Sequence, residues 1–313
     1  MKKWFIVLSA LSMCACASMN KNTVSYQMSK YDPQVYYVIS GDGADKEQAS
    51  TVALANMHQN MVQNVPNANQ AEQQIKDIVA NAKIGKAWRD KSSKDVKHYF
   101  ALAVVKRQTA EGILQAPINE IDARLGALAT QLQATEDKFA GLRAAFAMEP
   151  LLARRNVLQD LYIFVSANHT GYETERFNTY KKLYQERLAA VKVATAVRGE
   201  ENVILLSRIT DALHKMGLST VEAGNEKALL SVEVETQVDE YKSDRLKGLE
   251  WVATSAVVSL RDLQENATFA QFNVNDRAGT GRRQDSLRKS MESTGDKAAA
   301  QVTARLTDYL KTK

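Results

Sequence analysis

The chain has 313 residues, of which 45% are hydrophobic and 25% are charged, so its composition is that of a globular protein and excludes wholesale disorder. Only four prolines and fourteen glycines interrupt this length, which favours helix. The formal net charge of +5, from 41 basic and 36 acidic residues, is too small and too scattered to indicate nucleic-acid binding. The composition therefore predicts about two domains and no particular reaction.

Residues 1–15 have the pattern of a secretory signal peptide. Lys2 and Lys3 supply a positive start, and an apolar run follows from Trp4 to Met13. This run is shorter than the roughly 20 residues that a helix needs to span a bilayer. The segment is therefore interpreted as an export signal that precedes the folded part of the protein.

The end of this signal contains the only two cysteines of the chain. The sequence Met13-Cys14-Ala15-Cys16-Ala17 resembles a bacterial lipobox, in which a small residue precedes the cysteine that is lipidated. Cys16 fits better than Cys14, because Ala15 is small and Met13 is bulky. The resemblance implies lipidation at Cys16 and, since Ala17 stands where an inner-membrane retention Asp would stand, attachment to the outer membrane facing the periplasm. Ordinary cleavage at Ala15-Cys16-Ala17, which would leave a soluble periplasmic protein, is the alternative.

The segment after the signal is expected to contain a tether and then a small α/β unit. Residues 16–34 are polar and are predicted to form the lipidated cysteine and a flexible tether. Residues 35–106 are predicted to form the unit. Its elements are a strand at 35–40, a turn at Gly41 and Gly43, a helix at 46–62 with Asp45 as its N-cap, a helix at 68–82, and strands at 84–90 and 97–105.

Residues 107–198 are predicted to form a long antiparallel helical arm. Apolar residues recur at alternating spacings of three and four from Ile118 to Phe146, which is typical of a coiled-coil seam. The expected helix runs from Arg107 to Met148 and would span about 60 Å. Pro150 is expected to end or kink this helix. Helices at 151–167 and 172–197 supply complementary faces, so the arm folds back as a hairpin or pairs between two copies. The seam residues are Ile118, Ile121, Leu125, Leu128, Leu132, Phe139, Leu142 and Phe146.

Residues 199–313 are predicted to form a second α/β unit. A helix at 200–216, ended by Gly217, precedes strands at 218–222, 229–241, 249–263 and 268–274. Gly279 and Gly281 are expected to form a turn before a last helix at 283–311. The predicted fold class is therefore α+β, with two small α/β units separated by a long coiled-coil-like arm.

The N-terminal third of the chain combines several motifs in a set order. After the lipobox come a strand, a G-x-G pattern at Gly41 and Gly43, an alanine-rich helix with Ala49, and the strand HYFALAVV followed by Arg107. This order resembles the LPP20 family of bacterial lipoproteins over about residues 16–115. Phe100 departs from the family's usual spacing. The resemblance implies an outer-membrane lipoprotein with assembly roles in the envelope or flagellum and no known enzymatic activity.

Candidate chemistry is sparse in the sequence. Histidines 58, 98, 169 and 214 are isolated and do not have metal-ligand spacing. The Gly41 and Gly43 pair could cradle a phosphate, but Lys46 replaces the third glycine of the nucleotide motif. No nucleophile or metalloprotease motif is present. We therefore expect no catalytic, metal or cofactor residues and no enzymatic activity.

These observations predict a scaffold or adaptor lipoprotein that binds other envelope proteins. Pairing of two copies through the helical arm stays open. Two alternatives are a regulator that activates a peptidoglycan synthase and a periplasmic carrier that holds a small apolar ligand between its helices.

Overall fold

The computed structural model describes residues 21–90, 98–136, 138–199, 203–241 and 248–312, without the side chains of 138–140 and 241. Backbone contacts divide the chain into two compact units: unit 1 is Met1–Ile118 with Asn156–Tyr172, and unit 2 is Asn119–Arg155 with Glu173–Lys313. Each unit contains one sheet, which confirms a mixed α and β protein with two sheets. Residues 107–198, expected to be a separate arm, are shared between the two units in this division.

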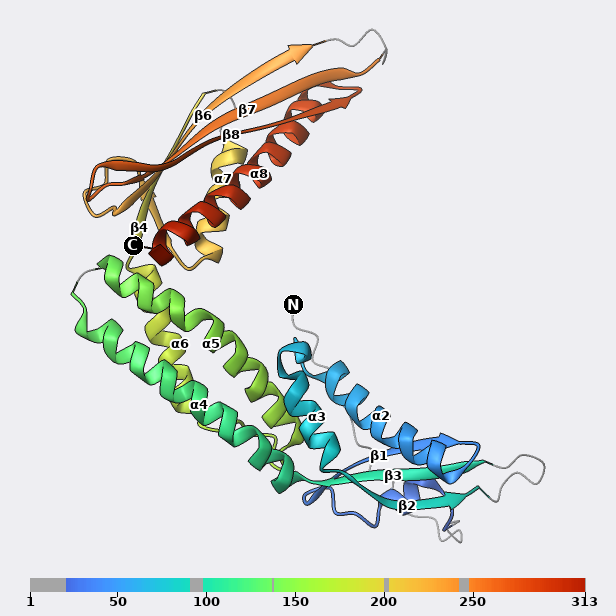
Figure 1. Cartoon of the computed structure of the whole chain (residues 1–313). Coiled ribbons are helices and arrows are strands. Elements are labelled where there is room, and N and C mark those ends of the chain that lie inside the picture. Colours follow the sequence, from blue (N-terminus) through green and yellow to red (C-terminus); the bar gives the residue numbers. More distant parts are fainter. Residues whose placement is uncertain (1–20, 91–97, 137, 200–202, 242–247, 313) are drawn as a thin grey trace, which may run out of the picture. The chain divides into compact units, whose positions relative to one another are not determined.

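Unit 1 is built on a three-stranded antiparallel sheet in the order β1-β3-β2 (Figure 1). The strands are β1 (Tyr36–Gly43), β2 (Lys83–Arg89) and β3 (Tyr99–Lys106). The central strand β3 is buried along five successive residues, Ala101 to Val105. A continuous buried run of this kind indicates that both faces of the sheet are covered.

Helix α2 (Lys46–Asn64) lies along one face of this sheet, followed by the short η1 (Ala68–Ala71) and by α3 (Glu72–Ala80). The predicted cap of α2 is confirmed. The Asp45 carboxylate accepts a hydrogen bond from the Gln48 backbone N–H at 2.8 Å, and the Gln48 side chain accepts one from the Ala44 N–H at 2.8 Å. The buried face of the helix consists of Ala49, Ala53, Met57 and Met61.

The opposite face of the sheet is covered by the segment that precedes β1. Helix α1 (Val24–Met28) and Tyr31 pack against a small core that includes Trp88. The Trp88 indole N–H donates to the Asn22 carbonyl at 2.7 Å. The prediction of a polar tether is therefore wrong for residues 21–34, because Val24 and other apolar side chains of this segment have a sheet face to cover.

Two long helices, α4 (Arg107–Ala134) and α5 (Lys138–Val165), contribute to both units. The prediction of one helix from 107 to 148 is wrong, because the chain leaves the helix after Ala134 and α5 continues through Pro150. Both helices bury a stripe of apolar residues, and the spacing of these residues continues from α4 into α5. The spacing alone therefore does not show that the helix is interrupted after Ala134. In unit 1, Arg107 joins the start of α4 to the end of α5 by donating to the Val165 carbonyl at 2.6 Å.

Unit 2 contains a five-stranded sheet in the order β5-β4-β6-β7-β8. Strand β4 (Lys192–Arg198) lies between β5 (Ser219–Glu222) and β6 (Leu230–Tyr241) and runs parallel to both. The remaining strands, β7 (Glu250–Asp262) and β8 (Ala267–Thr280), continue from β6 as an antiparallel meander.

Residues 192–197, which the sequence predicts as the end of a helix, belong to strand β4 instead. That helix, α6 (Thr174–Ala189), ends earlier. The alternation of Val193 and Val197 with smaller residues, followed by Gly199 at a φ of 108°, is the local signal of a strand and its end. Val193 and Val197 are four residues apart, a spacing that fits a helix as well as a strand. Over seven residues the strand period of two therefore cannot be distinguished from the helix period of 3.6.

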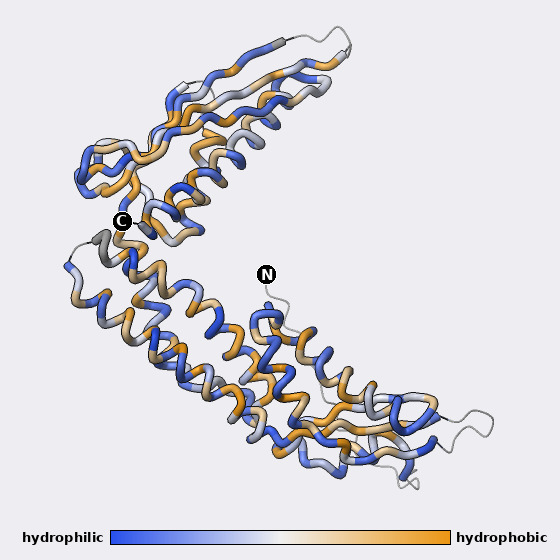
Figure 2. Tube along the Cα trace, in the orientation of Figure 1, coloured by the Kyte–Doolittle hydropathy of each residue, from blue (hydrophilic) through white to orange (hydrophobic). Residues whose placement is uncertain are grey.

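Helices α7 (Val203–Lys215) and α8 (Arg283–Thr312) cover one face of this sheet (Figure 1). The strands alternate in hydropathy along their length (Figure 2), and in β6 Val232, Val234 and Thr236 are buried and Val238 is half-buried. Gly217, with a φ of 82°, ends α7 as predicted. The core of unit 2 therefore lies between the sheet and these two helices.

Candidate functional site

The predicted lipidation site lies outside the described residues. This applies to the signal peptide at 1–15, to Cys14 and Cys16, and to the sorting residue Ala17. Lipidation at Cys16 stays a prediction from the sequence.

Three of the four predicted turn glycines lie in strands instead. Gly41 and Gly43 belong to β1 and Gly279 to β8, whereas Gly281 lies in the connection to α8. A Cβ atom at Gly41 would lie 2.1 Å from the Ala53 backbone nitrogen, so this glycine lets α2 approach the strand. The G-x-G pattern at 41–43 therefore reports a close helix–strand contact and not a turn.

The predicted seam residues are mostly buried within the chain. Leu128 is half-buried, and the side chain of Phe139 lies outside the described residues. The buried members are Ile118, Ile121, Leu125, Leu132, Leu142 and Phe146. Three of them, Leu132, Leu142 and Phe146, belong to the core cluster of unit 2.

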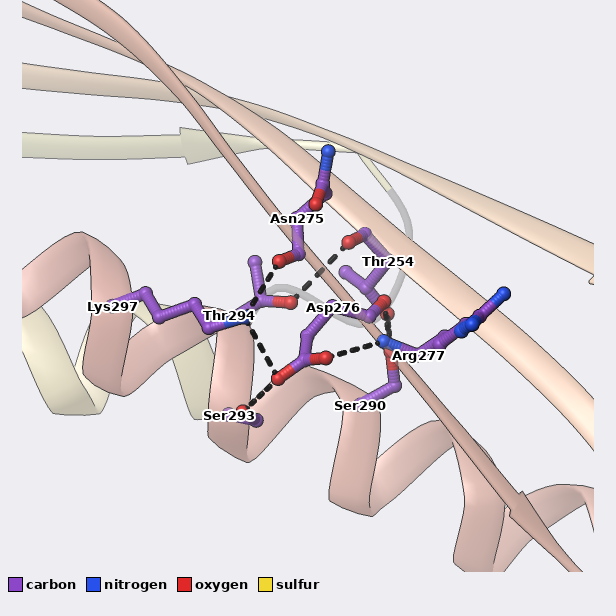
Figure 3. A network of polar contacts seen from close by, with 8 residues as sticks. All are labelled: Thr254, Asn275, Asp276, Arg277, Ser290, Ser293, Thr294 and Lys297. Atoms are coloured by element: carbon purple, nitrogen blue, oxygen red, sulfur yellow. Dashed lines mark hydrogen bonds and ion pairs between the residues drawn. The ribbon is translucent and has the colours of Figure 1, made fainter.

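A polar network joins the first half of α8 to β7 and β8 (Figure 3). The Ser290 hydroxyl donates to the Asp276 carbonyl at 2.9 Å and is hydrogen-bonded to the Thr254 hydroxyl at 2.9 Å. Thr294 donates to the Thr254 carbonyl at 3.3 Å. Ser290, Thr294 and Thr254 are fully buried, so their hydroxyls need these partners.

Asp276 is the charged member of this network. Its carboxylate accepts a hydrogen bond from the Ser293 hydroxyl and one from the Arg277 backbone N–H at 2.8 Å, and it forms an ion pair with Lys297 at 3.1 Å (Figure 3). These contacts, led by the Ser293 hydrogen bond, lower the pKa of Asp276 to about 2. A carboxylate with so low a pKa is a poor general base near neutral pH. The network therefore serves best to hold α8 in register on the sheet.

The other face of the unit 2 sheet carries exposed side chains. From Val252 to Asp262, even-numbered positions of β7 are buried under the helices, and the odd-numbered positions between them are half-buried or exposed on the other face. Val257 on this face is 36% exposed, and Asn273 on β8 is exposed. Strand β8 also has no neighbour on its outer side among the described strands. We call the outward residues of β6, β7 and β8 the open sheet face.

The histidines have local partners instead of a shared centre. His58 contacts Glu72 at 3.0 Å and His98 contacts Asp42 at 3.0 Å. The His58 hydrogen bond is the main reason why the pKa of Glu72 lies below its usual value. Within the part of the chain that the structure describes, no group of three acidic, histidine or cysteine side chains is placed to hold a metal ion.

Comparisons with known proteins add little to this picture. No family model matches the chain, and no curated protein matches it. Among the described helices, none is long and apolar enough to cross a membrane.

Several solved structures of bacterial lipoproteins and secreted proteins show distant similarity. A secreted protein from Helicobacter pylori is 15% identical, with a TM-score of 0.39 and coverage of 86% of this chain and 97% of that chain. A minor lipoprotein from Acinetobacter baumannii is 11% identical, with a TM-score of 0.31 and coverage of 39% and 94%. Rare lipoprotein B from Shewanella oneidensis is 9% identical, with a TM-score of 0.29 and coverage of 38% and 95%. At these TM-scores we draw no conclusion from them about fold or function.

Proposed function

We propose that this chain is a non-enzymatic lipoprotein, lipidated at Cys16 and attached to the periplasmic face of the outer membrane, that acts as an envelope scaffold or adaptor. The signal peptide and lipobox support the location. The resemblance of residues 16–115 to the LPP20 family supports an assembly role. In this proposal α4 and α5 form a coiled-coil-like hairpin that spaces contact surfaces, and the burial of its seam residues favours pairing within one copy.

The observation that carries the scaffold role is the open sheet face of unit 2. A sheet with one face packed on helices and one face exposed offers a broad, rigid surface for protein contact. The edge strand β8 is 14 residues long and could add a partner strand along the sheet. The face also has a charge pattern, because β6 presents Glu235 and Asp239 outward, besides Glu233, which pairs with Arg261 of β7 at 3.8 Å. We therefore expect the partner surface to be cationic opposite β6.

Crosslinking in cells tests this proposal. A photoreactive amino acid replaces Asn273 on the open sheet face or, as a control, Lys289 on the exposed side of α8. We expect a discrete protein adduct from position 273 and none from position 289. Equal labelling at both positions, or none at position 273, would contradict a docking role for this face.

The anchor is tested separately through the two cysteines. Metabolic labelling with radioactive palmitate should be lost in Cys16→Ser and retained in Cys14→Ser, because only Cys16 has a small residue before it. Label that persists in Cys16→Ser and disappears in Cys14→Ser would show that Cys14 is the lipidated residue. Label in neither variant nor the wild type would exclude lipidation and favour a soluble periplasmic protein.

A further inference from the structure

Two adjoining hollows lie in unit 2, on the side of its helices. The first has a volume of about 560 Å³ and lies between α5 and the end of α8. The second has a volume of about 510 Å³ and is lined by α5, α6, α7 and α8. They share Phe146, Glu149 and Lys311, so they adjoin, and we call the two hollows together the groove. Each hollow is within the size range of small-molecule sites.

The floor of this groove is apolar. Phe146 is 5% exposed and belongs to the core of unit 2, so its ring has a set position. Ala147 lines the first hollow, and Met216, half-buried, lines the second. Apolar side chains that are held by the core and also line an open groove offer a ready surface for a hydrocarbon chain.

The rim of the groove is cationic. Arg143, Lys215 and Lys311 line it, against the single carboxylate of Glu149. Arg143 donates to the Thr312 carbonyl at 3.4 Å. Within the described residues, Lys215 and Lys311 form no ion pair with a carboxylate. The two lysines against the one carboxylate of Glu149 leave a local positive charge that a negatively charged group would balance.

A hydroxyl group completes the second hollow. Burial, and to a smaller extent the nearby charge of Glu149, raise the pKa of Tyr184 to about 12. Its hydroxyl therefore stays protonated at neutral pH and is able to donate a hydrogen bond to an anion.

We propose that this groove binds a single-chain amphiphile with an anionic headgroup, of which a long-chain carboxylate is the simplest example. The hydrocarbon chain lies on Phe146 and Met216, and the headgroup lies between Lys215 and Lys311. A neutral amphiphile would leave the excess positive charge unbalanced and would bind less tightly. The headgroup chemistry is the same whether the ligand is a free amphiphile or an anionic lipid of a nearby membrane. This ligand site is separate from the scaffold role, because it lies on the helix side of the sheet and not on the open sheet face.

Calorimetry on the mature chain tests the proposal. The chain carries Cys16→Ser so that its own acyl groups do not compete, and the probe is oleate below its micelle concentration, with oleyl alcohol as the neutral analogue. We expect saturable binding of oleate, and we expect Lys215→Gln with Lys311→Gln to weaken it about tenfold, because the headgroup loses both of its cationic partners. Binding of oleyl alcohol should not change. The matched control is Lys227→Gln with Lys289→Gln, which removes two exposed lysines elsewhere in unit 2.

A second variant tests the floor of the groove. Ala147→Trp fills the first hollow and should weaken both probes, whereas Ala123→Trp, at an exposed position of α4, should weaken neither. Both substitutions are at exposed positions, so folding should survive.

The source of the ligand is resolved by a parallel sedimentation assay with phosphatidylglycerol vesicles. Binding of monomeric oleate that depends on the two lysines assigns a free amphiphile. Vesicle binding that depends on them, without oleate binding, assigns a membrane lipid. No saturable binding of either probe, or equal losses in the control pair, would overturn the proposal. Either result leaves the crosslinking test at Asn273 unaffected, so the two proposals fail separately.

Discussion

The buried ion pair between Asp122 on α4 and Arg155 on α5 provides the sharpest test of the helical packing in unit 2. The Arg155 Nε atom donates to Asp122 Oδ1 at 2.9 Å, and Nη2 donates to Oδ2 at 3.4 Å. The two side chains are 0% and 1% exposed. The guanidinium also lies over the ring of Phe177 on α6, 4.8 Å from its centroid. One cation thus joins three helices.

Replacing Asp122 with Ala removes the charge that balances Arg155. A buried guanidinium without its carboxylate costs far more than the pair contributes when it is intact, so we expect a loss of about 3–5 kcal/mol in the free energy of unfolding. Replacing both partners, as Asp122→Leu with Arg155→Met, removes the charge and the polar groups together. This double variant should recover to within about 1 kcal/mol of the parent protein.

Urea unfolding measures these differences. Without the predicted signal peptide, which contains Trp4, the chain has one tryptophan in each unit, Trp88 in unit 1 and Trp251 in unit 2. A Trp88→Phe background of this shortened chain makes fluorescence report unit 2 alone. The control is Arg154→Ala, because Arg154 is the neighbouring arginine on the same helix and is exposed. It should change the free energy of unfolding by less than about 0.5 kcal/mol.

Two outcomes would refute this reasoning. A cost below about 1 kcal/mol for Asp122→Ala would show that water reaches Arg155 or that another group balances it. A double variant as unstable as Asp122→Ala would show that packing around the pair, and not the unbalanced charge, sets the cost.

Two further predictions concern backbone approach and pH. Gly41→Ala should destabilise unit 1 by about 1–3 kcal/mol, because its Cβ would overlap the Ala53 backbone. Gly112→Ala, which lies in open space on α4, should instead stabilise it by about 0.5–1 kcal/mol. Thermal unfolding compares the two variants, and equal shifts in their melting temperatures would contradict the close contact at Gly41. Since the pKa of Asp276 is lowered from 3.8 to about 2 in the folded protein, the stability that this group contributes is present above pH 3.8 and is lost as the pH falls towards 2. Asp276→Asn should therefore flatten the dependence of unit 2 stability on pH in that window, as measured by urea midpoints, while an unchanged slope would remove Asp276 as its source.

Local chemistry made parts of this fold predictable. Asp45 caps α2 because its carboxylate accepts a hydrogen bond from a backbone N–H that has no partner within the first turn. The residues that form this cap, Asp45 to Gln48, are contiguous in the sequence, so the cap can be predicted from it. The long strands of unit 2 alternate because one face is packed and the other is exposed, so period two indicates both the strand and its inner side. Gly217 ends α7 for an equally local reason.

The errors arose where distant segments decide the structure. The same glycine pattern that marks a turn also marks a strand against which a helix packs, and only the position of Ala53 distinguishes the two. Likewise, the break after Ala134 lies within an unbroken series of apolar spacings, because α4 and α5 both bury their stripes. Strand β4 was missed because it is too short to show its period beside a long helix.

The groove could not be predicted from the sequence for a similar reason. Its lining comes from residues at 143–153, 184, 212–216, 303–307 and 311, which share no motif or spacing. A lone exposed lysine such as Lys215 has no distinguishing pattern in the sequence. Only the packing of α5, α6 and α7 near the end of α8 brings Lys215 and Lys311 to the same apolar hollow.

Helix α8 connects the two proposed surfaces of unit 2. Its first half faces the sheet with small hydroxyl side chains at 286, 290 and 294, which bond to the strands and set the register of the helix. Its second half faces the core with Ala298, Val302, Leu306 and Leu310, all fully buried, which provide the apolar packing. The burial of Leu310 leaves the next residue, Lys311, exposed at the groove.

This arrangement makes a testable distinction between the two surfaces. A protein on the open sheet face and an amphiphile in the groove would contact opposite sides of the same unit, so neither should exclude the other. Crosslinking from Asn273 should therefore be unchanged in Lys215→Gln with Lys311→Gln. If that lysine pair instead abolished the adduct, the groove and the open sheet face would have to be parts of one coupled site, and the ligand would act as a regulator of protein contact.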